Sequence, residues 1–252
     1  MVSKSYAKVN IFLKIAGKRE NYHELVSRFV RVHSLYDVIS FEYGVFEKFS
    51  LIGNFGCETK SNTIYKVYEK LKEISPKVEE YFKTHCVIVE KKIPEFAGLG
   101  GGSSNAATFM LMVNEVCNLE LSRDEMAKLA MNIGADIPFF IYEYDSANVT
   151  GIGEIVEKFD EEILDIEIVT PKIECNTGEI FKSFRDKFYK EISTKEKENL
   201  LSSKSKDVLA KLSIKEANDL YMPAIDVYPQ LKEFEKEGFF FSGSGSSFFK
   251  VK

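Results

Sequence analysis

The sequence predicts a fold that mixes β-strands with α-helices and is long enough for two modest domains. Three observations support this. The chain has 252 residues, 44% of them hydrophobic and 13% aromatic, so it can bury at least one full core. Segments with a period of two residues alternate with segments of helical period. A change of texture after Asp145 predicts a domain boundary near residue 155, which divides residues 1–155 from residues 156–252.

The first predicted element is a half-buried strand from Tyr6 to Ile15. Its odd-numbered residues are apolar and form one face, while Lys8 and Asn10 share the other face with three further residues. A second strand is expected over residues 38–43, after a turn-like region rich in tyrosine and histidine. The polar face of the first strand could direct Lys8 and Asn10 at one ligand, although each taken singly is more often an exposed strand residue.

Helical patterns follow in the middle of the chain. Asn62 and its neighbour Ser61 can cap a helix with apolar residues at helical spacing over residues 64–71. Residues 85–90 are strand-like, and residues 103–116 have a helical apolar stripe. A capping box at residues 122–125 opens another helix, which glycine 134 can close.

The second half of the chain has weaker patterns. A loop is expected around glycines 151 and 153, and a strand over residues 163–170. The charged stretch 187–215 predicts solvated helices rather than a binding patch. Two apolar strands, residues 239–241 and 248–249, are joined by a turn of small residues.

The composition argues against several classes of partner. The 34 basic and 39 acidic residues give a formal charge of -5, which does not favour a nucleic acid. No apolar run reaches membrane-spanning length and the amino terminus has no apolar signal core, so we expect a cytoplasmic protein without a membrane partner. The cysteines form no Cys-x-x-Cys pair and are expected to be buried free thiols, namely Cys57, Cys86, Cys117 and Cys175.

The strongest chemical signal is a glycine-rich segment between a predicted strand and a predicted helix. Four glycines in five positions let backbone N–H groups point into one concavity, and the following helix adds its positive end, so an anion is the expected occupant. The segment is neither a Walker A loop nor a dinucleotide fingerprint. A purely structural turn is the alternative. The segment reads Pro94-Glu95-Phe96-Ala97-Gly98-Leu99-Gly100-Gly101-Gly102-Ser103-Ser104.

Asp136 is a second candidate for chemistry. It lies in Gly134-Ala135-Asp136-Ile137-Pro138-Phe139-Phe140, just beyond the end of a predicted helix and before what we expect to be a hydrophobic strand. A carboxylate at such a junction can accept a proton from a hydroxyl group. On local chemistry alone, a turn-forming aspartate is the favoured interpretation.

Taken together in order and spacing, four segments resemble the 4-diphosphocytidyl-2-C-methyl-D-erythritol kinase family of the galactokinase, homoserine, mevalonate and phosphomevalonate kinase superfamily. The glycine-serine loop points to the superfamily, and Tyr22-His23-Glu24-Leu25 narrows the resemblance to this family. The segment Ser242-Gly243-Ser244-Gly245-Ser246 is similar to a further glycine motif of the superfamily. The four segments are Lys8-Val9-Asn10, Tyr22-His23-Glu24-Leu25, Gly98-Leu99-Gly100-Gly101-Gly102-Ser103-Ser104 and Gly134-Ala135-Asp136-Ile137-Pro138-Phe139-Phe140.

The resemblance implies a fold and a reaction. The fold would comprise two α+β domains, an ATP-binding amino-terminal one and a ferredoxin-like carboxyl-terminal one, with the active site in the cleft. The reaction would transfer a phosphoryl group from ATP to the 2-hydroxyl of 4-diphosphocytidyl-2-C-methyl-D-erythritol, in the non-mevalonate route to isoprenoid precursors. Mg²⁺ is expected with ATP, since metal neutralises the transferring phosphates. Ser103 is a candidate ligand, although a helix cap is the more economical interpretation.

The resemblance also implies residue roles. Asp136 would be the base and Lys8 its partner. The segment Pro94 to Ser104 would wrap the triphosphate, and Asn62 would approach the adenine. Tyr22 and Phe181 would sandwich the cytosine, with the remaining substrate contacts made by Phe29, the His23 backbone, Asn10 and Thr177.

The sequence departs from the family pattern at Glu95 and Phe96, where small or apolar residues are usual. These two residues bear on the adenosine side of the site. Other small-molecule kinases of the superfamily, and a catalytically silent nucleotide-binding regulator, are the alternative functions. We expect a monomer or a weak homodimer.

Overall fold

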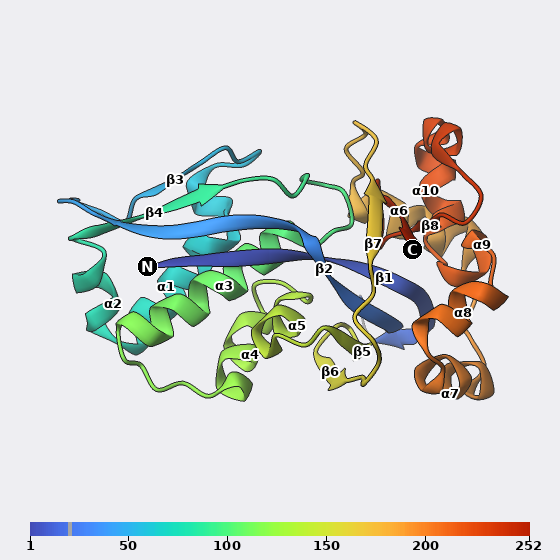
Figure 1. Cartoon of the computed structure of the whole chain (residues 1–252), viewed down its shortest axis with the longest axis horizontal. Helices are drawn as coiled ribbons and strands as arrows, with labels where there is room; N and C mark the ends of the chain where they lie inside the picture. The colour runs from blue at the N-terminus through green and yellow to red at the C-terminus, as the bar shows by residue number, and fades with distance from the viewer. Residues whose placement is uncertain (20–21) are drawn as a thin grey trace. The chain divides into compact units, whose positions relative to one another are not determined.

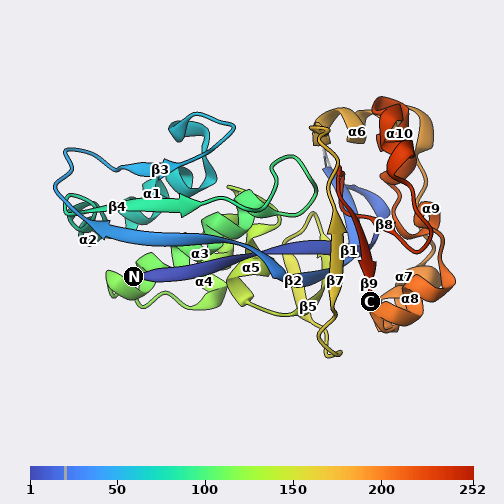
Figure 2. The same cartoon turned by 45° about the horizontal axis from the view of Figure 1, so that its top comes forward.

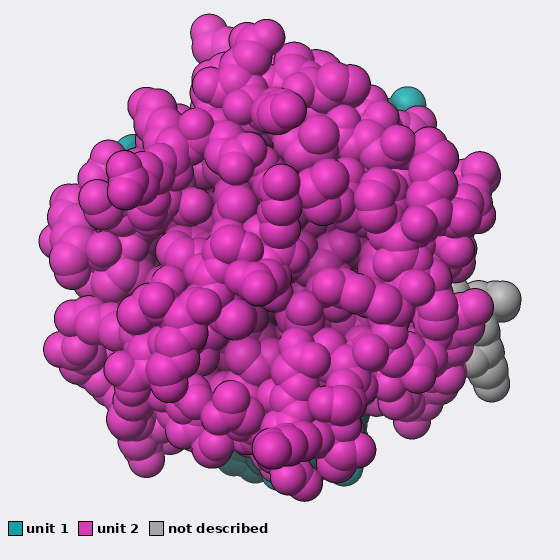
Figure 3. Space-filling model, turned by 90° about the vertical axis from the view of Figure 1, so that its right-hand side faces the viewer, with its two compact units in different colours: residues 1–7, 35–93, 101–143 teal, residues 8–34, 94–100, 144–252 magenta. Residues whose placement is uncertain are grey.

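The computed structural model describes residues 1–19 and 22–252, and the side chain of Tyr22 lies outside the described part. The described chain forms two compact units, coloured separately in Figure 3. Unit 1 comprises residues 1–7, 35–93 and 101–143, and unit 2 comprises residues 8–34, 94–100 and 144–252. The chain thus passes between the units several times. The two units do not test the single domain boundary expected near residue 155, which stays a prediction.

Two long strands, β1 (Val2–Arg19) and β2 (Tyr22–Tyr43), pair with each other (Figure 1). The strand predicted over Tyr6 to Ile15 is confirmed within β1, but the expectation of a half-buried strand was wrong. Lys8 and Asn10, on the face expected to be polar and exposed, are 3% and 1% exposed. The turn expected before residue 38 was also wrong, because aromatic and β-branched residues there favour a continuous strand.

Unit 1 combines strands with a helical layer. The end of β2 pairs antiparallel with β4 (His85–Glu90), and β4 pairs parallel with β3 (Leu51–Gly53). Helices α1 and α3 lie side by side, as Figures 1 and 2 both show. The helices are η1 (Thr59–Ser61), α1 (Thr63–Ile74), α2 (Pro76–Tyr81), α3 (Gly101–Val116), α4 (Arg123–Met131) and α5 (Ile137–Tyr142).

In unit 1, local sequence signals were mostly sufficient to predict the helices and strands. The Asn62 side chain caps α1, and Ser122 and Glu125 form the predicted capping box of α4. Helix α3 begins two residues earlier than expected, at Gly101. The hydrophobic strand expected directly after Asp136 was wrong, since residues 137–142 form α5. A short apolar run does not by itself separate strand from helix, and Pro138 in the first turn favours a helix.

Unit 2 contains parts of both sheets. Residues 25–30 of β2 pair with β5 (Ser146–Gly151), which pairs with β6 (Ile155–Lys158) across the glycine loop predicted there. The second sheet has the order β7-β9-β8, with bounds Ile166–Val169, Phe248–Val251 and Phe240–Phe241. The remaining helices are α6 (Thr177–Ser183), η2 (Phe184–Phe188), α7 (Thr194–Ser202), α8 (Ser205–Lys211), α9 (Ile214–Ala217), α10 (Tyr221–Val227) and η3 (Pro229–Phe234).

The cysteines and the helices test two further expectations. Cys86, Cys117 and Cys175 are buried free thiols, as predicted, whereas Cys57 is free but exposed. Within residues 1–19 and 22–252, none of the helices has both the length and the apolar character needed to cross a bilayer.

Candidate functional site

The amino-terminal part of the glycine-rich segment, residues 94–100, belongs to unit 2 and has an unusual backbone. Phe96, Gly98 and Gly100 have φ angles of 53°, 72° and 69°, in the left-handed region that favours glycine. A Cβ atom added at Gly98 would lie 2.1 Å from the carbonyl oxygen of Ser242. Gly98 is therefore required both for its φ angle and for the close approach of residue 242.

Lys8 contacts this part of the loop. Its backbone N–H donates to the Leu99 carbonyl at 3.0 Å, and its Nζ donates to the Gly98 carbonyl at 3.2 Å and to Asn10 Oδ1 at 2.7 Å. The ammonium also lies 4.5 Å from the centre of the Phe29 ring, a cation–π contact. Asn10 is fixed in turn by a 2.9 Å bond to Ser27 Oγ. Lys8 thus links the loop to two further residues predicted for the site, Asn10 and Phe29.

The glycine motif near the carboxyl terminus meets the same group. Ser242 Oγ donates to the Gly98 carbonyl at 3.0 Å, so that one carbonyl accepts bonds from Lys8 and Ser242. The buried Asn218 holds the motif by donating to the carbonyls of Phe241 and Gly243, at 2.9 and 2.8 Å. Segments that are far apart in the sequence are therefore brought to one point in unit 2.

A second part of unit 2 holds three residues predicted to contact the substrate, namely His23, Thr177 and Phe181, whereas Phe29 lies beside Lys8. The rings of His23 and Phe181 stack with centroids 5.3 Å apart and an angle of 22° between them. Burial lowers the pKa of the His23 imidazole, and the positive charges of Arg185 and Lys18 lower it further. Its Nε2 is buried without a hydrogen-bond partner. Thr177, which begins α6, exchanges a 2.7 Å hydrogen bond with Ser244 of the carboxyl-terminal glycine motif.

The predicted partner of Phe181 in a cytosine sandwich is Tyr22. Its side chain lies outside the described residues, so the sandwich stays a prediction. In the structure, the neighbour that stacks on Phe181 is His23.

The remaining site residues belong to unit 1, at the first turn of α3. Thr63, the residue after the α1 cap Asn62, donates from Oγ1 to the Gly102 carbonyl at 2.7 Å. This contact places the start of α1 beside the start of α3. A Cβ atom at Gly134 would lie 3.6 Å from Ser103 Oγ, which brings the Asp136 segment to the same turn.

Asp136 itself is half-buried and precedes α5. Local chemistry favoured a turn-forming aspartate, whereas the family resemblance implied a base. In the structure Asp136 occupies the N-cap position of α5, but its side chain makes no capping hydrogen bond to that helix.

Sequence reasoning missed a buried polar network in unit 1. The carboxylate of Asp37 bonds Lys91, Asn105 and two backbone N–H groups, and Ser5 bonds both Ser104 and Asn105. Asp37 lies in the region expected to be a turn, which hid its role. The position of Lys91, three residues before the glycine-rich segment, was the available signal.

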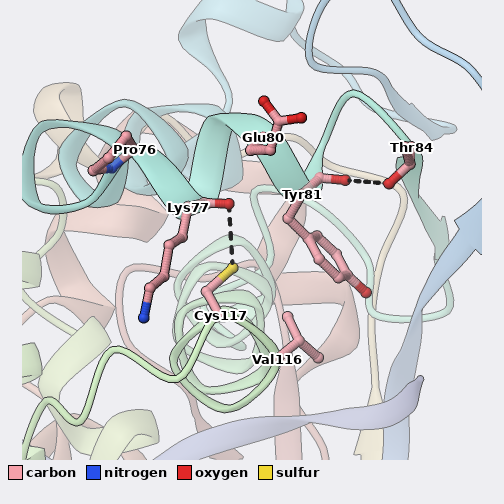
Figure 4. Close-up of a pocket in the computed structure, with 7 residues that line it drawn as sticks. All are labelled: Pro76, Lys77, Glu80, Tyr81, Thr84, Val116 and Cys117. Carbon is pink, nitrogen blue, oxygen red and sulfur yellow. Dashed lines mark hydrogen bonds between the residues drawn. The ribbon is translucent and has the colours of Figure 1, made fainter.

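A surface hollow of about 630 Å³ in unit 1 lies away from these residues. Figure 4 shows that α2 and the end of α3 line it, with the Cys117 thiol directed at the Lys77 carbonyl 3.9 Å away. Residues predicted for the site do not line it. The lining residues are Pro76, Lys77, Glu80, Tyr81, Thr84, Val116 and Cys117.

Comparisons with known proteins bear on the whole chain. The model described as the GHMP kinases N terminal domain matches residues 62–144. The 4-diphosphocytidyl-2-C-methyl-D-erythritol kinase of Sulfurimonas denitrificans is 54% identical, over 99% of this chain and 96% of its own length. The enzyme of the same name from a Sulfurovum species is 47% identical over 98% of each chain.

A solved crystal structure is also similar to this chain. The crystal structure of a 4-(cytidine 5'-diphospho)-2C-methyl-D-erythritol kinase aligns with a TM-score of 0.75 and 28% identity, covering 100% of this chain and 90% of its own. This similarity confirms the predicted α+β kinase fold, whose strands form two sheets in the described part of the chain. On the strength of near full-length identity and a shared fold, the chain belongs to the 4-diphosphocytidyl-2-C-methyl-D-erythritol kinase family, within the GHMP kinases.

Proposed function

We propose that the protein transfers the γ-phosphoryl group of ATP to the 2-hydroxyl of 4-diphosphocytidyl-2-C-methyl-D-erythritol, in the non-mevalonate route to isoprenoid precursors. The observation that carries this proposal is the meeting of Lys8 and the Ser242 motif on the carbonyl of Gly98. These contacts would hold the glycine-rich loop in a shape with positive φ angles at every second residue, Phe96, Gly98 and Gly100, which turns backbone N–H groups toward one side.

ATP would bind along the loop from Pro94 to Ser104. The loop leads into the amino-terminal end of α3, where unpaired N–H groups and the helix dipole attract phosphate. Asn62 would lie on the adenine side, because Thr63 beside it bonds Gly102. Phe96 is 55% exposed, so its ring is available to a bound nucleotide.

The cytidine would bind near α6. Phe181 offers an aromatic face, and stacking on such a face is worth about 1 to 3 kcal/mol per base. Tyr22 would cover the other side of the base, and the backbone of His23 would recognise its edge. Thr177 and Asn10 would contact the polyol diphosphate, since the Ser242–Ser246 motif adjoins both residues in unit 2.

Asp136 would accept the proton of the attacking hydroxyl, and Lys8 would counter the negative charge that develops there. Proton removal by a positioned carboxylate typically contributes about 10²- to 10⁴-fold to the rate. Asp136 lies at the amino-terminal end of α5, in the segment that adjoins the first turn of α3, where the phosphates of ATP would bind.

Mg²⁺ would accompany ATP and neutralise charge on the transferring phosphates. The Ser103 hydroxyl, on the first turn of α3, is an oxygen donor of the kind that suits this ion. Mg²⁺ keeps most of its ligands as water and phosphate, so one hydroxyl fits its needs. A cytoplasmic location stays a prediction.

The test measures ADP release with purified protein, ATP and Mg²⁺. Release is expected with 4-diphosphocytidyl-2-C-methyl-D-erythritol and not with mevalonate or homoserine. Release with mevalonate or homoserine instead would indicate another kinase of the superfamily. Binding of ATP without release from any acceptor would favour the silent regulator.

A further inference from the structure

A single buried carboxylate bonds residues on both sides of the glycine-rich segment. Asp37, on β2, is 0% exposed, and its Oδ1 accepts from the N–H groups of Lys92 and Ile93 at 2.6 and 2.8 Å. Its Oδ2 accepts from Lys91 Nζ at 2.5 Å and from Asn105 Nδ2 at 2.9 Å. Both oxygens are thus satisfied, which a buried charge requires.

The groups that bond Asp37 lie on either side of the glycine-rich segment in the sequence. Ile93 immediately precedes Pro94, where the segment begins, and Asn105 immediately follows Ser104, where it ends. All of the bonded groups belong to unit 1. The Asp37 carboxylate therefore fixes the spacing between the two ends of the loop.

Lys91 and Ser5 complete this clamp. Lys91 Nζ also donates to Asn105 Oδ1 at 3.0 Å, so the lysine bridges the carboxylate and α3. Ser5 accepts from Asn105 Nδ2 at 2.9 Å and donates to Ser104 at 2.8 Å. A Cβ atom at Gly101 would lie 3.4 Å from Lys91 Nζ, so the clamp directly adjoins the first residue of α3.

We propose that Asp37 is a positioning residue for ATP, which holds the two ends of the triphosphate loop at the separation that the nucleotide needs. This inference rests on the proposed role of the loop. A loop whose ends are already fixed loses less conformational freedom when it binds phosphate, so the clamp should raise the affinity for ATP. It touches neither substrate, so the affinity for the cytidine compound should depend on it much less.

The test compares Asp37→Asn with a matched control, Asp219→Asn. Asp219 is also a buried aspartate paired with a lysine, since its Oδ1 accepts from Lys14 Nζ at 2.8 Å and its Oδ2 from the Ile15 N–H at 3.0 Å. It belongs to unit 2, and the bonds it makes do not reach the glycine-rich segment. Both variants should lose stability. We expect KM for ATP to rise at least about tenfold in Asp37→Asn alone, the scale of one lost charge-assisted bond.

Asn105→Ala is a milder second variant, because it releases one end of the loop and leaves three of the donors to Asp37 in place. It should raise KM for ATP by a smaller factor, with KM for the cytidine substrate nearly unchanged. Hydrogen exchange of the amides in residues 95–104 should accelerate in both loop variants and not in Asp219→Asn. A purely structural role would not produce this selectivity.

Two outcomes are distinguishable. If wild-type protein shows no saturable dependence on ATP, the proposed function fails. If wild type is normal but the Asp37 and Asn105 variants change KM for ATP no more than Asp219→Asn does, the positioning role is refuted while the function stands.

Discussion

The two units hold their candidate site residues by different means. In unit 1, buried side chains form the support, with Asp37 bonding both ends of the glycine-rich segment. In unit 2, side chains such as Lys8 also take part, but the tightest contact is between backbone groups, because Gly98 meets Ser242 at a distance that leaves no room for a side chain. The side-chain support should tolerate conservative changes in part, whereas the backbone contact should tolerate almost none.

The units also differ, in part, in the chemistry that we assign to them. We assign phosphate chemistry to residues of each unit, the first turn of α3 and Asp136 in unit 1 and Lys8 with residues 94–100 in unit 2. The aromatic group around α6, in unit 2, would recognise the base. Changes in unit 1 should therefore affect kcat or the use of ATP, and changes near α6 should affect the cytidine substrate.

The largest effect is expected for Asp136→Asn. Asparagine keeps the size of the side chain but cannot take a proton at neutral pH, so kcat should fall about 10²- to 10⁴-fold with little change in either KM. Steady-state kinetics on the folded variant would measure this. Retention of more than about a tenth of the wild-type kcat would remove Asp136 from the role of base.

The next effect concerns the backbone contact. Gly98→Ala would force a Cβ atom against the Ser242 carbonyl at a positive φ, so the loop must move, and we expect weaker ATP binding with a melting temperature several degrees lower. Gly102→Ala is the matched control for stability, since its Cβ atom would meet Thr63 Oγ1 at an ordinary 3.7 Å. Equal melting temperatures for the two variants would show that the backbone contact between Gly98 and Ser242 does tolerate a side chain.

A moderate effect is expected for Phe181→Ala. Loss of one stacking face should weaken binding of the cytidine substrate roughly 5- to 150-fold and leave ATP binding nearly unchanged. Calorimetric titration of each ligand would measure both. Parallel losses for the two ligands would argue against a separate recognition region in unit 2.

The smallest effect is a pH dependence from His23. Because burial, Arg185 and Lys18 lower its pKa, the folded protein resists protonation of this imidazole. Below about pH 6.5 the unfolded chain takes up a proton that the folded protein does not, so stability should fall as the pH drops.

His23→Phe should reduce this acid sensitivity, which melting curves at about pH 7.5 and about pH 5.5 would detect. The variant keeps an aromatic ring against Phe181, so it serves as its own packing control. An unchanged pH dependence would assign the effect to other groups.

Local signals in the sequence predicted the local elements well. The Asn62 cap, the capping box of α4 and strand β4 each depend on a few adjacent residues, and the structure agrees with all three. The predictions that were wrong concern residues whose structure does not depend on adjacent residues alone. The apolar run of α5 suited a strand equally well, and the burial of Lys8 required contacts with distant segments.

The sequence by itself determined the family, the glycine-rich loop and the identity of the candidate catalytic residues, because these are motifs of contiguous residues. Only the tertiary structure decided which groups support them. Gly98 and Ser242 are separated by 144 positions, and Asp37 and Asn105 by 68. Such pairs leave no periodic trace in the chain, since their choice depends on how strands and helices pack rather than on local conformational preference.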